Sequence, residues 1–173
     1  MMPTPIPADE AERLQALRQL QLLDTPPDER YDRVVRFAAE QLDMPIALVS
    51  LIDGQRQWFK SRLGMADAET ARDISFCGHA IMGSELFVVE DASLDPRFAD
   101  NPLVTGAPHV RFYAGAPISA PSGHRIGTLC VIDSVPRKLG RVERAVLEVL
   151  RGLVNEALAG RDDDAGPAED APR

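Results

Sequence analysis

The chain is poor in the residue types that define several structural classes. Its 173 residues include two cysteines, three histidines and one tryptophan, and aromatic residues make up only 5%. Two cysteines without a CxxC pair are not a disulfide framework, and the histidines lack zinc-site spacing. No apolar run reaches the roughly 20 residues of a membrane helix, and the N-terminus lacks the basic flank of a secretory signal. We expect a cytoplasmic protein with no metal site and no membrane contact.

Positive charge is also scarce. Acidic residues number 27 and basic residues 19, which gives a net charge of -8. Such a surface repels phosphate backbones, so we expect no nucleic-acid partner. Hydrophobic residues at 45% and charged residues at 27% are ordinary for a globular protein, and the length fits one domain.

Composition divides the chain into three segments. Residues 1–8 are rich in proline and are expected to be mobile. Residues 9–159 carry the periodic apolar pattern of one folded domain. Residues 160–173 hold mostly Asp, Ala and Pro, and we expect them to form an acidic, disordered tail.

Helical patterns occur at both ends of the folded segment. Asp9 is expected to cap a first helix, whose leucine stripe packs either on its own domain or on a second copy. Thr25 is expected to cap a second helix that ends at Pro45. The last helix is predicted from about Gly140 to Ala159, and its expected buried stripe is Val142, Val146, Val149, Leu150, Leu153 and Ala157.

Strand patterns fill the region between these helices. Neighbouring strands joined by turns predict a central antiparallel sheet of five to six strands, and helices segregated at the chain ends predict an α+β fold. The N- and C-terminal helices are expected on one face of this sheet. A short helix capped by Ser75, together with loops, covers the other face and forms a small-molecule pocket there. The predicted strands are 46–52, 57–63, 86–89, 110–118 and 125–132.

Seven short motifs, in this order, make the chain resemble the GAF domain family over about residues 10–158. Within that family it resembles the sensor modules at the front of bacterial histidine kinases and diguanylate cyclases. The resemblance implies a GAF/PAS-like fold, and this fold agrees with the layered arrangement expected from the patterns. The motifs are Leu22-Leu23-Asp24-Thr25-Pro26-Pro27, Ala47-Leu48-Val49-Ser50-Leu51-Ile52-Asp53, Gln57-Trp58-Phe59-Lys60-Ser61, Ser75-Phe76-Cys77-Gly78-His79-Ala80-Ile81, Asp91-Ala92 with Asp95-Pro96-Arg97-Phe98, Arg111-Phe112-Tyr113-Ala114-Gly115-Ala116-Pro117, and Gly127-Thr128-Leu129-Cys130-Val131-Ile132-Asp133.

The resemblance implies a regulatory role without naming a ligand. Members of the family bind varied small effectors, and many are dimers through their terminal helices. The cyclic-nucleotide signature is absent here, and so is the cysteine that attaches bilin. Cys77-Gly78 resembles one cysteine site of the GAF enzyme free methionine-R-sulfoxide reductase, but no cysteine stands at about 95–109, where the resemblance places the catalytic one.

Eight residues are candidates for lining the pocket, and none is assigned a catalytic role. Cys77 is either a small buried residue or a reactive thiol. Arg97 and Arg111 either bind an anionic effector or pair with nearby aspartates. Trp58 shares a strand face with Lys60, and either that pair or its neighbours face the pocket. The eight candidates are Trp58, Phe76, Cys77, His79, Arg97, Phe98, Arg111 and Tyr113.

Three functions remain open at this point. The first is a non-catalytic regulatory module that binds an unidentified effector, forms a homodimer through its terminal helices and acts in trans on a signalling protein of the histidine kinase or cyclase type. The second is a thiol redox enzyme or sensor based on Cys77, similar to the sulfoxide reductase. The third is a module that serves only as a dimerisation scaffold, with a pocket filled by its own side chains. The cofactor, if any, is unknown.

Overall fold

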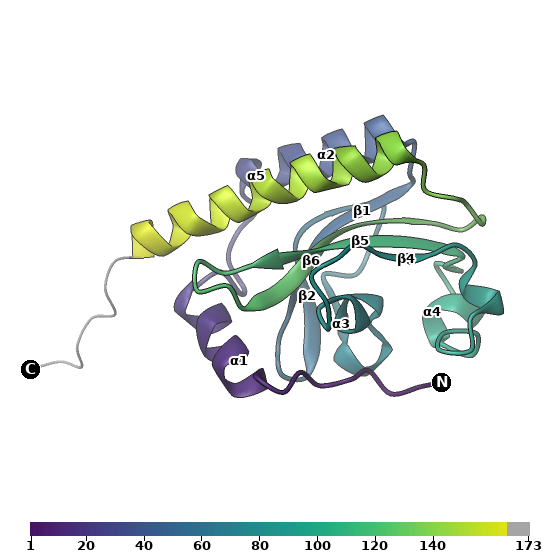
Figure 1. Cartoon of the computed structure of the whole chain (residues 1–173), viewed down its shortest axis with the longest axis horizontal. Helices are drawn as coiled ribbons and strands as arrows, with labels where there is room; N and C mark the ends of the chain where they lie inside the picture. Colours follow the sequence, from purple (N-terminus) through teal and green to yellow (C-terminus); the bar gives the residue numbers. More distant parts are fainter. Residues whose placement is uncertain (166–173) are drawn as a thin grey trace, which may run out of the picture.

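A six-stranded antiparallel sheet separates the molecule into two layers (Figure 1). The computed structural model describes residues 1–165. The strand order is β3-β2-β1-β6-β5-β4, and each neighbouring pair is antiparallel, which confirms the predicted α+β class. The strands are β1 (Ile46–Ile52), β2 (Arg56–Leu63), β3 (Glu69–Ala71), β4 (Phe87–Val89), β5 (Phe112–Ser119) and β6 (Arg125–Asp133).

The central strands are buried on both faces because each face has its own cover. All seven residues of β1 are buried, as predicted from apolar residues at both its odd and its even positions. Gly127 of β6 lies against the backbone of β1, where a Cβ would come within 1.8 Å of the Ser50 carbonyl oxygen. Only glycine therefore permits this close approach of the two strands.

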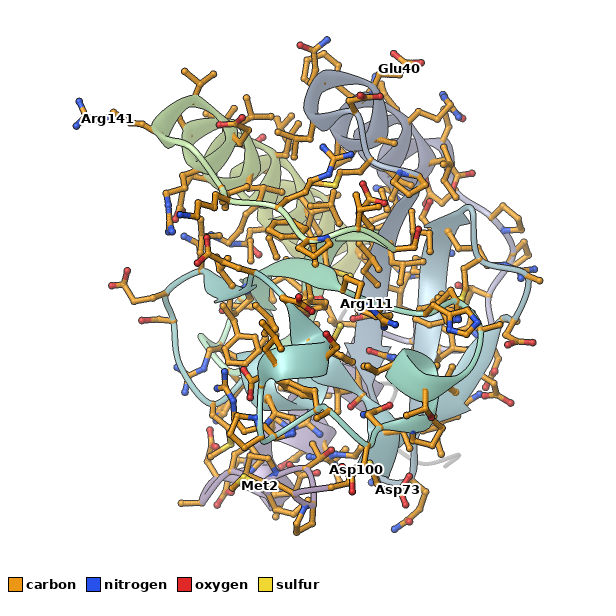
Figure 2. The ribbon with its side chains drawn as sticks, turned by 90° about the vertical axis from the view of Figure 1, so that its right-hand side faces the viewer. Met2, Glu40, Asp73, Asp100, Arg111 and Arg141 are labelled. Atoms are coloured by element: carbon orange, nitrogen blue, oxygen red, sulfur yellow. The ribbon has the colours of Figure 1, made fainter. Side chains whose placement is uncertain are left out.

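Two long helices cover one face of the sheet: α2 (Glu29–Leu42) and α5 (Arg141–Ala165). They lie side by side in Figure 1. Figure 2 shows Glu40, near the end of α2, at the same end of the layer as Arg141, the first residue of α5. The two helices are therefore antiparallel, and we call this part of the molecule the helix layer.

Helix α1 (Glu10–Gln19) lies apart from this pair, near the end of the sheet (Figure 1). Leu17 and Leu20 are buried within the chain, which settles the open question about the leucine stripe in favour of intramolecular packing. Arg13 donates to the carbonyl oxygen of Ile52 at 2.7 Å and so ties α1 to the end of β1.

The opposite face of the sheet is covered by short elements, which we call the roof. They are η1 (Arg72–Ile74), α3 (Phe76–Ala80), η2 (Ala92–Leu94) and α4 (Pro102–Thr105) with the loops that join them. Ser75 caps α3 as predicted, since its Oγ accepts from the Gly78 amide. We call this side of the sheet the roofed face.

Three helix ends differ from the sequence prediction. The N-cap of α2 is Asp28, not Thr25, because consecutive prolines at 26 and 27 keep the preceding backbone extended. Asp9 makes no side-chain capping bond to α1. Asn101 caps the short helix α4, and neither this helix nor β3 was predicted.

The predicted buried stripe of α5 is wrong at three of its six residues, because Val142, Val149 and Leu153 are exposed. Leu150 is buried as predicted, and Val146 and Ala157 pack partly buried against the core. The core-facing residues that the prediction missed are Leu147, Val154 and Leu158. Helix α5 thus carries two apolar stripes, which a periodicity argument cannot assign to their partners. The helix also continues to Ala165, so residues 160–165 are helical rather than tail, and residues 166–173 lie outside the described part.

The N-terminal segment, expected to be mobile, lies across the roof. Thr4 Oγ1 donates to the carbonyl oxygens of Arg72 and Asp73, at 3.2 and 2.9 Å. A Cβ at Gly78 would lie 2.3 Å from the Thr4 methyl group, so this glycine allows the close packing. Figure 2 shows Met2, Asp73 and Asp100 near one another, far from the helix layer. No helix within residues 1–165 is long and apolar enough to span a bilayer.

Candidate functional site

Five polar side chains meet between α3 and the central strands. The Sγ atoms of Cys77 and Cys130 are 3.9 Å apart. Tyr113 Oη and Thr128 Oγ1 lie 3.0 and 3.1 Å from Cys77 Sγ, and each donates a hydrogen bond to this sulfur. Ser50 Oγ is 3.1 Å from Thr128 Oγ1 and can donate to it. We call these five residues the thiol cluster, and all of them are buried.

Strand register brings the cluster together. Ser50 of β1 stands directly opposite Thr128 of β6, and Gly115 of β5 stands opposite Cys130. A Cβ at Gly115 would lie 2.3 Å from Tyr113 Oη, so the glycine leaves space for the tyrosine to extend over its own strand. The tyrosine hydroxyl can therefore reach the sulfur on α3.

The hydroxyl donors give the two thiols opposite character. Burial alone raises the pKa of Cys77, but the hydrogen bonds from Cys130, Ser50, Thr128 and Tyr113 outweigh it and lower the pKa to about 7. The interaction with Cys77, followed by burial, raises the pKa of Cys130. Burial, followed by the charge on Cys77, raises the pKa of Tyr113. Cys77 is thus the group of this cluster that ionises first.

Aromatic rings close the space beside the cluster. Phe76 stacks on Phe98 with ring centroids 4.1 Å apart and planes 8° apart. Phe76 also contacts Tyr113 at 5.3 Å. Phe87 packs edge-on against Tyr113 at 6.0 Å and against Phe98 at 6.2 Å. The predicted pocket residues on this face therefore pack on one another.

His79 and Arg97 form the outer rim of this aromatic group. The His79 ring meets Phe98 edge-on at 4.8 Å, and burial, followed by the charge of Arg97, lowers the pKa of His79. The Arg97 guanidinium lies over Phe87 and Phe98, at 5.0 and 5.3 Å from their centroids. It also forms an ion pair with Asp95 at 2.6 Å, which realises the internal-pairing alternative for this arginine.

Arg111 forms no ion pair with an aspartate among the described residues, so the internal-pairing alternative is wrong for this arginine. Its guanidinium donates to the carbonyl oxygens of Val104 and Val110, both at 3.0 Å. Figure 2 shows Arg111 beside α4, between this helix and the sheet. Arg111 therefore holds α4 on the sheet through backbone acceptors rather than through an aspartate.

A cavity of about 20 Å³ lies on the roofed face, between α3 and the sheet. Such a volume holds about one water-sized molecule. Gln57 and Cys77 both line it, together with Met65 and Leu103. Gln57 Oε1 is buried and has no hydrogen-bond partner among the described residues, so the wall of this cavity carries one unused acceptor.

Trp58 does not belong to this group, which corrects its place among the pocket candidates. Its ring packs in the core under the helix layer, and Phe59 is the neighbour that faces the roof. The sequence reasoning also missed Ser50, Gln57 and Thr128. The signal available for Ser50 and Thr128 was a single hydroxyl residue within the buried run of each strand.

A second candidate surface lies on the helix layer, facing away from the sheet. Phe37 is 46% exposed, and Val142, Val149 and Leu153 are 74%, 67% and 46% exposed. We call these four residues the apolar strip. A groove of about 700 Å³ runs between α2 and α5 along Phe37, Val149 and Leu153. A second groove of about 380 Å³ continues to Val142.

Within residues 1–165, no three His, Cys, Asp or Glu side chains come together in a way that could hold a metal ion.

The chain belongs to the GAF domain family. The family model for this domain matches residues 26–158, which confirms the resemblance drawn from the seven motifs. A cyclic di-GMP phosphodiesterase of Pseudomonas aeruginosa is 45% identical over 155 residues. This alignment covers 89% of the present chain but 26% of the phosphodiesterase, so the chain spans about a quarter of that protein.

Solved structures share this fold at low sequence identity. The GAF domain of a phosphoenolpyruvate-protein phosphotransferase from Coxiella burnetii has a TM-score of 0.64 at 19% identity, covering 90% of this chain and 98% of that one. Free methionine-R-sulfoxide reductase from Neisseria meningitidis, solved with its substrate, has a TM-score of 0.63 at 15% identity, covering 95% and 99%. At such identities these likenesses establish the fold and nothing more.

Proposed function

We propose that this GAF domain is a non-catalytic regulatory module, which forms a homodimer through the apolar strip and passes a signal to an output enzyme through α5. The observation that carries the proposal is the strip itself. Four large apolar side chains stay exposed on the two longest helices, on the side opposite the roofed face. Exposed apolar patches of this kind mark sites of protein association.

The spacing of apolar residues on α5 supports a second copy as the partner. Val142, Val146, Val149 and Leu153 are separated by four, three and four residues. This alternation places them along the seam of a coiled coil, where two helices interlock their side chains. Val146 also packs partly against the core, whereas Val142, Val149 and Leu153 are exposed, so α5 can bind its own domain and still offer these three side chains to a partner helix.

The cavity on the roofed face is too small for most effectors, so binding of an effector there would require the roof to move. A cavity of about 20 Å³ admits an effector larger than water only if the roof moves. An effector that favours the open roof would shift the population between two arrangements of the domain. Because α3 rests on β5 and β6, which also support α5, such a shift reaches the output helix.

The sulfoxide reductase alternative finds less support. Cys77 faces a cavity of about 20 Å³, and a methionine sulfoxide molecule is many times that size. No second cysteine lies in the roof at 95–109. These two observations argue against reduction of a sulfoxide at Cys77.

The proposed output is an enzyme of cyclic di-GMP turnover. A relative at 45% identity supports this choice over a histidine kinase, because the present chain aligns with a quarter of a phosphodiesterase that bears this activity in its name. The output enzyme acts either as a separate partner or as a further part of the same polypeptide.

A chimera tests this function directly. The matched segment of the Pseudomonas aeruginosa phosphodiesterase is replaced by this chain, and hydrolysis of cyclic di-GMP is measured. We expect the chimera to retain hydrolysis, and Val149→Asp to change its rate several-fold because the charge breaks the apolar seam.

The matched control is Leu94→Asp, since Leu94 is exposed to 80% but lies on η2, away from the strip. This control is expected to leave the hydrolysis rate unchanged. Equal rates for the chimera with and without Val149→Asp would contradict a regulatory role for the strip.

A further inference from the structure

We propose that Cys77 and Cys130 are a peroxide-sensitive thiol pair, which closes to a disulfide beneath the roof. The two Sγ atoms lie 3.9 Å apart on separate elements, Cys77 on α3 and Cys130 on β6. A disulfide bond is about 2 Å long, so the sulfurs need to approach by about 2 Å. Oxidation would be the input of the proposed regulatory function. The effect of oxidation on signalling rests on that proposed function, whereas formation of the disulfide does not.

The surroundings of Cys77 stabilise a thiolate. Two hydroxyl groups donate to its sulfur, Tyr113 Oη at 3.0 Å and Thr128 Oγ1 at 3.1 Å. Ser50 can donate to the Thr128 oxygen, so this hydroxyl keeps its own proton directed at the sulfur. Hydrogen bonds to the charged form of a thiol lower its pKa, and here the pKa falls to about 7. The hydroxyl donors therefore favour ionisation of Cys77 over ionisation of Cys130.

The small cavity gives the oxidant a place beside the sulfur. It is bordered by Cys77 and by Gln57, whose buried Oε1 has no partner in the described part of the chain. That oxygen can accept a hydrogen bond from the O–H of a peroxide. Hydrogen peroxide is one oxygen atom larger than water, and the flexible, half-buried Met65 side chain at the cavity border can yield this space.

The chemistry proceeds in two balanced steps. The Cys77 thiolate attacks one oxygen of hydrogen peroxide, an S–O bond forms, and the O–O bond breaks. The hydroxide that leaves takes up the proton released by the Cys77 thiol and becomes water. Cys130 then attacks the Cys77 sulfenic acid, an S–S bond forms, and hydroxide leaves with the Cys130 proton as a second water. The two sulfurs together lose two electrons, and the two peroxide oxygens gain them.

Closing this bond changes the contacts of the roof. The Cys77 sulfur moves away from the hydroxyls of Tyr113 and Thr128, which then lose their acceptor. Cys77 lies between Phe76, which stacks on Phe98, and Gly78, which packs on Thr4. Oxidation therefore shifts α3 against both the aromatic group and the N-terminal segment.

The test uses the whole reduced protein, treated with hydrogen peroxide at neutral pH and quenched with a thiol-alkylating reagent. Mass spectrometry is expected to show loss of both free thiols and a peptide in which Cys77 is linked to Cys130. A dithiol reductant is expected to reverse the link. With Cys130→Ala, we expect a sulfenic acid on Cys77, trapped as a dimedone adduct.

A matched pair of tyrosine variants separates this chemistry from mere stability. The rate of Cys77 oxidation is measured at a series of pH values, and the pH at which it is half-maximal is compared. Tyr113→Phe removes one donor to the sulfur, so this midpoint is expected to move upward from about 7. Tyr31→Phe removes a buried hydroxyl on the other face and is expected to leave the midpoint unchanged.

Two results would overturn the proposal. One is a folded protein whose thiols stay unmodified in excess peroxide while the urea-unfolded chain oxidises. The other is oxidation of Cys77 that never links to Cys130. Either result leaves the proposed regulatory function standing, because the chimera tests it without oxidation.

Discussion

The roofed face and the outer surface of the helix layer differ in how they use apolar side chains. On the roofed face the rings of Phe76, Phe98 and Tyr113 are turned inward and fill the space that a ligand would need. On the helix layer Phe37 and Val149 point into solvent beside an open groove. The two surfaces lie on opposite sides of one sheet (Figure 1).

This difference indicates a division of roles. The roofed face holds the thiol cluster, in which hydrogen bonds lower the pKa of the Cys77 thiol. The outer surface of the helix layer instead carries the apolar strip, whose residues on α5 have the spacing of a helix-pairing seam. We infer that a stimulus acts on the roofed face and that association occurs on the helix layer, with the sheet between them.

The largest contrast is expected between two phenylalanines, one on each side. Phe98→Ala removes a fully buried ring and leaves a cavity, so the free energy of unfolding should fall by about 3–5 kcal/mol. Phe37→Ala trims a half-exposed ring, so the change in the monomer should stay within about 0.5 kcal/mol. Urea unfolding of both variants at low concentration measures the two values. Equal losses would contradict the distinction between a packed roof and a free strip.

A second prediction concerns the carboxylate that ties α1 to the roof. Glu10 accepts hydrogen bonds from Arg13, and it pairs with Arg72 of η1. Burial raises the pKa of Glu10, but the hydrogen bonds and charges of the two arginines outweigh it and lower the pKa from 4.5 to about 2. A lowered pKa stabilises the fold above the unfolded value, and this stabilisation is lost as the pH falls through the folded value.

We therefore expect Glu10→Gln to lower the free energy of unfolding by about 2 kcal/mol at pH 7. The difference from the unmodified protein should begin to shrink near pH 4.5 and should vanish near pH 2. Urea unfolding across this pH range measures it. Glu12→Gln, at an exposed position of the same helix, is the control and should change the free energy of unfolding at pH 7 much less. A constant difference across the range would refute the linkage.

A loss of stability smaller than that of Phe98→Ala or Glu10→Gln is expected at the start of the helix layer. Asp28 caps α2 by accepting from the Arg30 amide at 2.9 Å. Asp28→Ala should lower the free energy of unfolding by about 1 kcal/mol, whereas Asp28→Asn keeps an oxygen acceptor and should cost less. Thermal unfolding of the two variants tests this order, and the reverse order would argue against capping.

The sequence was a sufficient guide to the layers but not to the contacts between them. Apolar runs such as Ile46–Ile52 predict strands because burial on both faces needs apolar residues on both parities. The strand β3 was missed because three residues, Glu69, Thr70 and Ala71, are too few to show a periodic pattern. The start of α2 was misplaced because two prolines resemble a helix start, although they hold the chain extended up to Asp28.

The candidate site was predictable only in part. Phe76, Cys77 and Tyr113 were expected on one face, and the structure brings them together. The distance between Cys77 and Cys130 depends on how α3 sits over β6, which no local pattern specifies. The outward stripe of α5 looked buried because apolar spacing shows that a face binds something without showing what binds it.

Sedimentation velocity of the unmodified chain, Val149→Asp and Leu94→Asp measures whether the protein forms a dimer through the apolar strip. We expect a dimer for the unmodified chain and for Leu94→Asp, and a folded monomer for Val149→Asp. A monomeric unmodified chain, or a dimer that survives Val149→Asp, would contradict dimerisation through the strip.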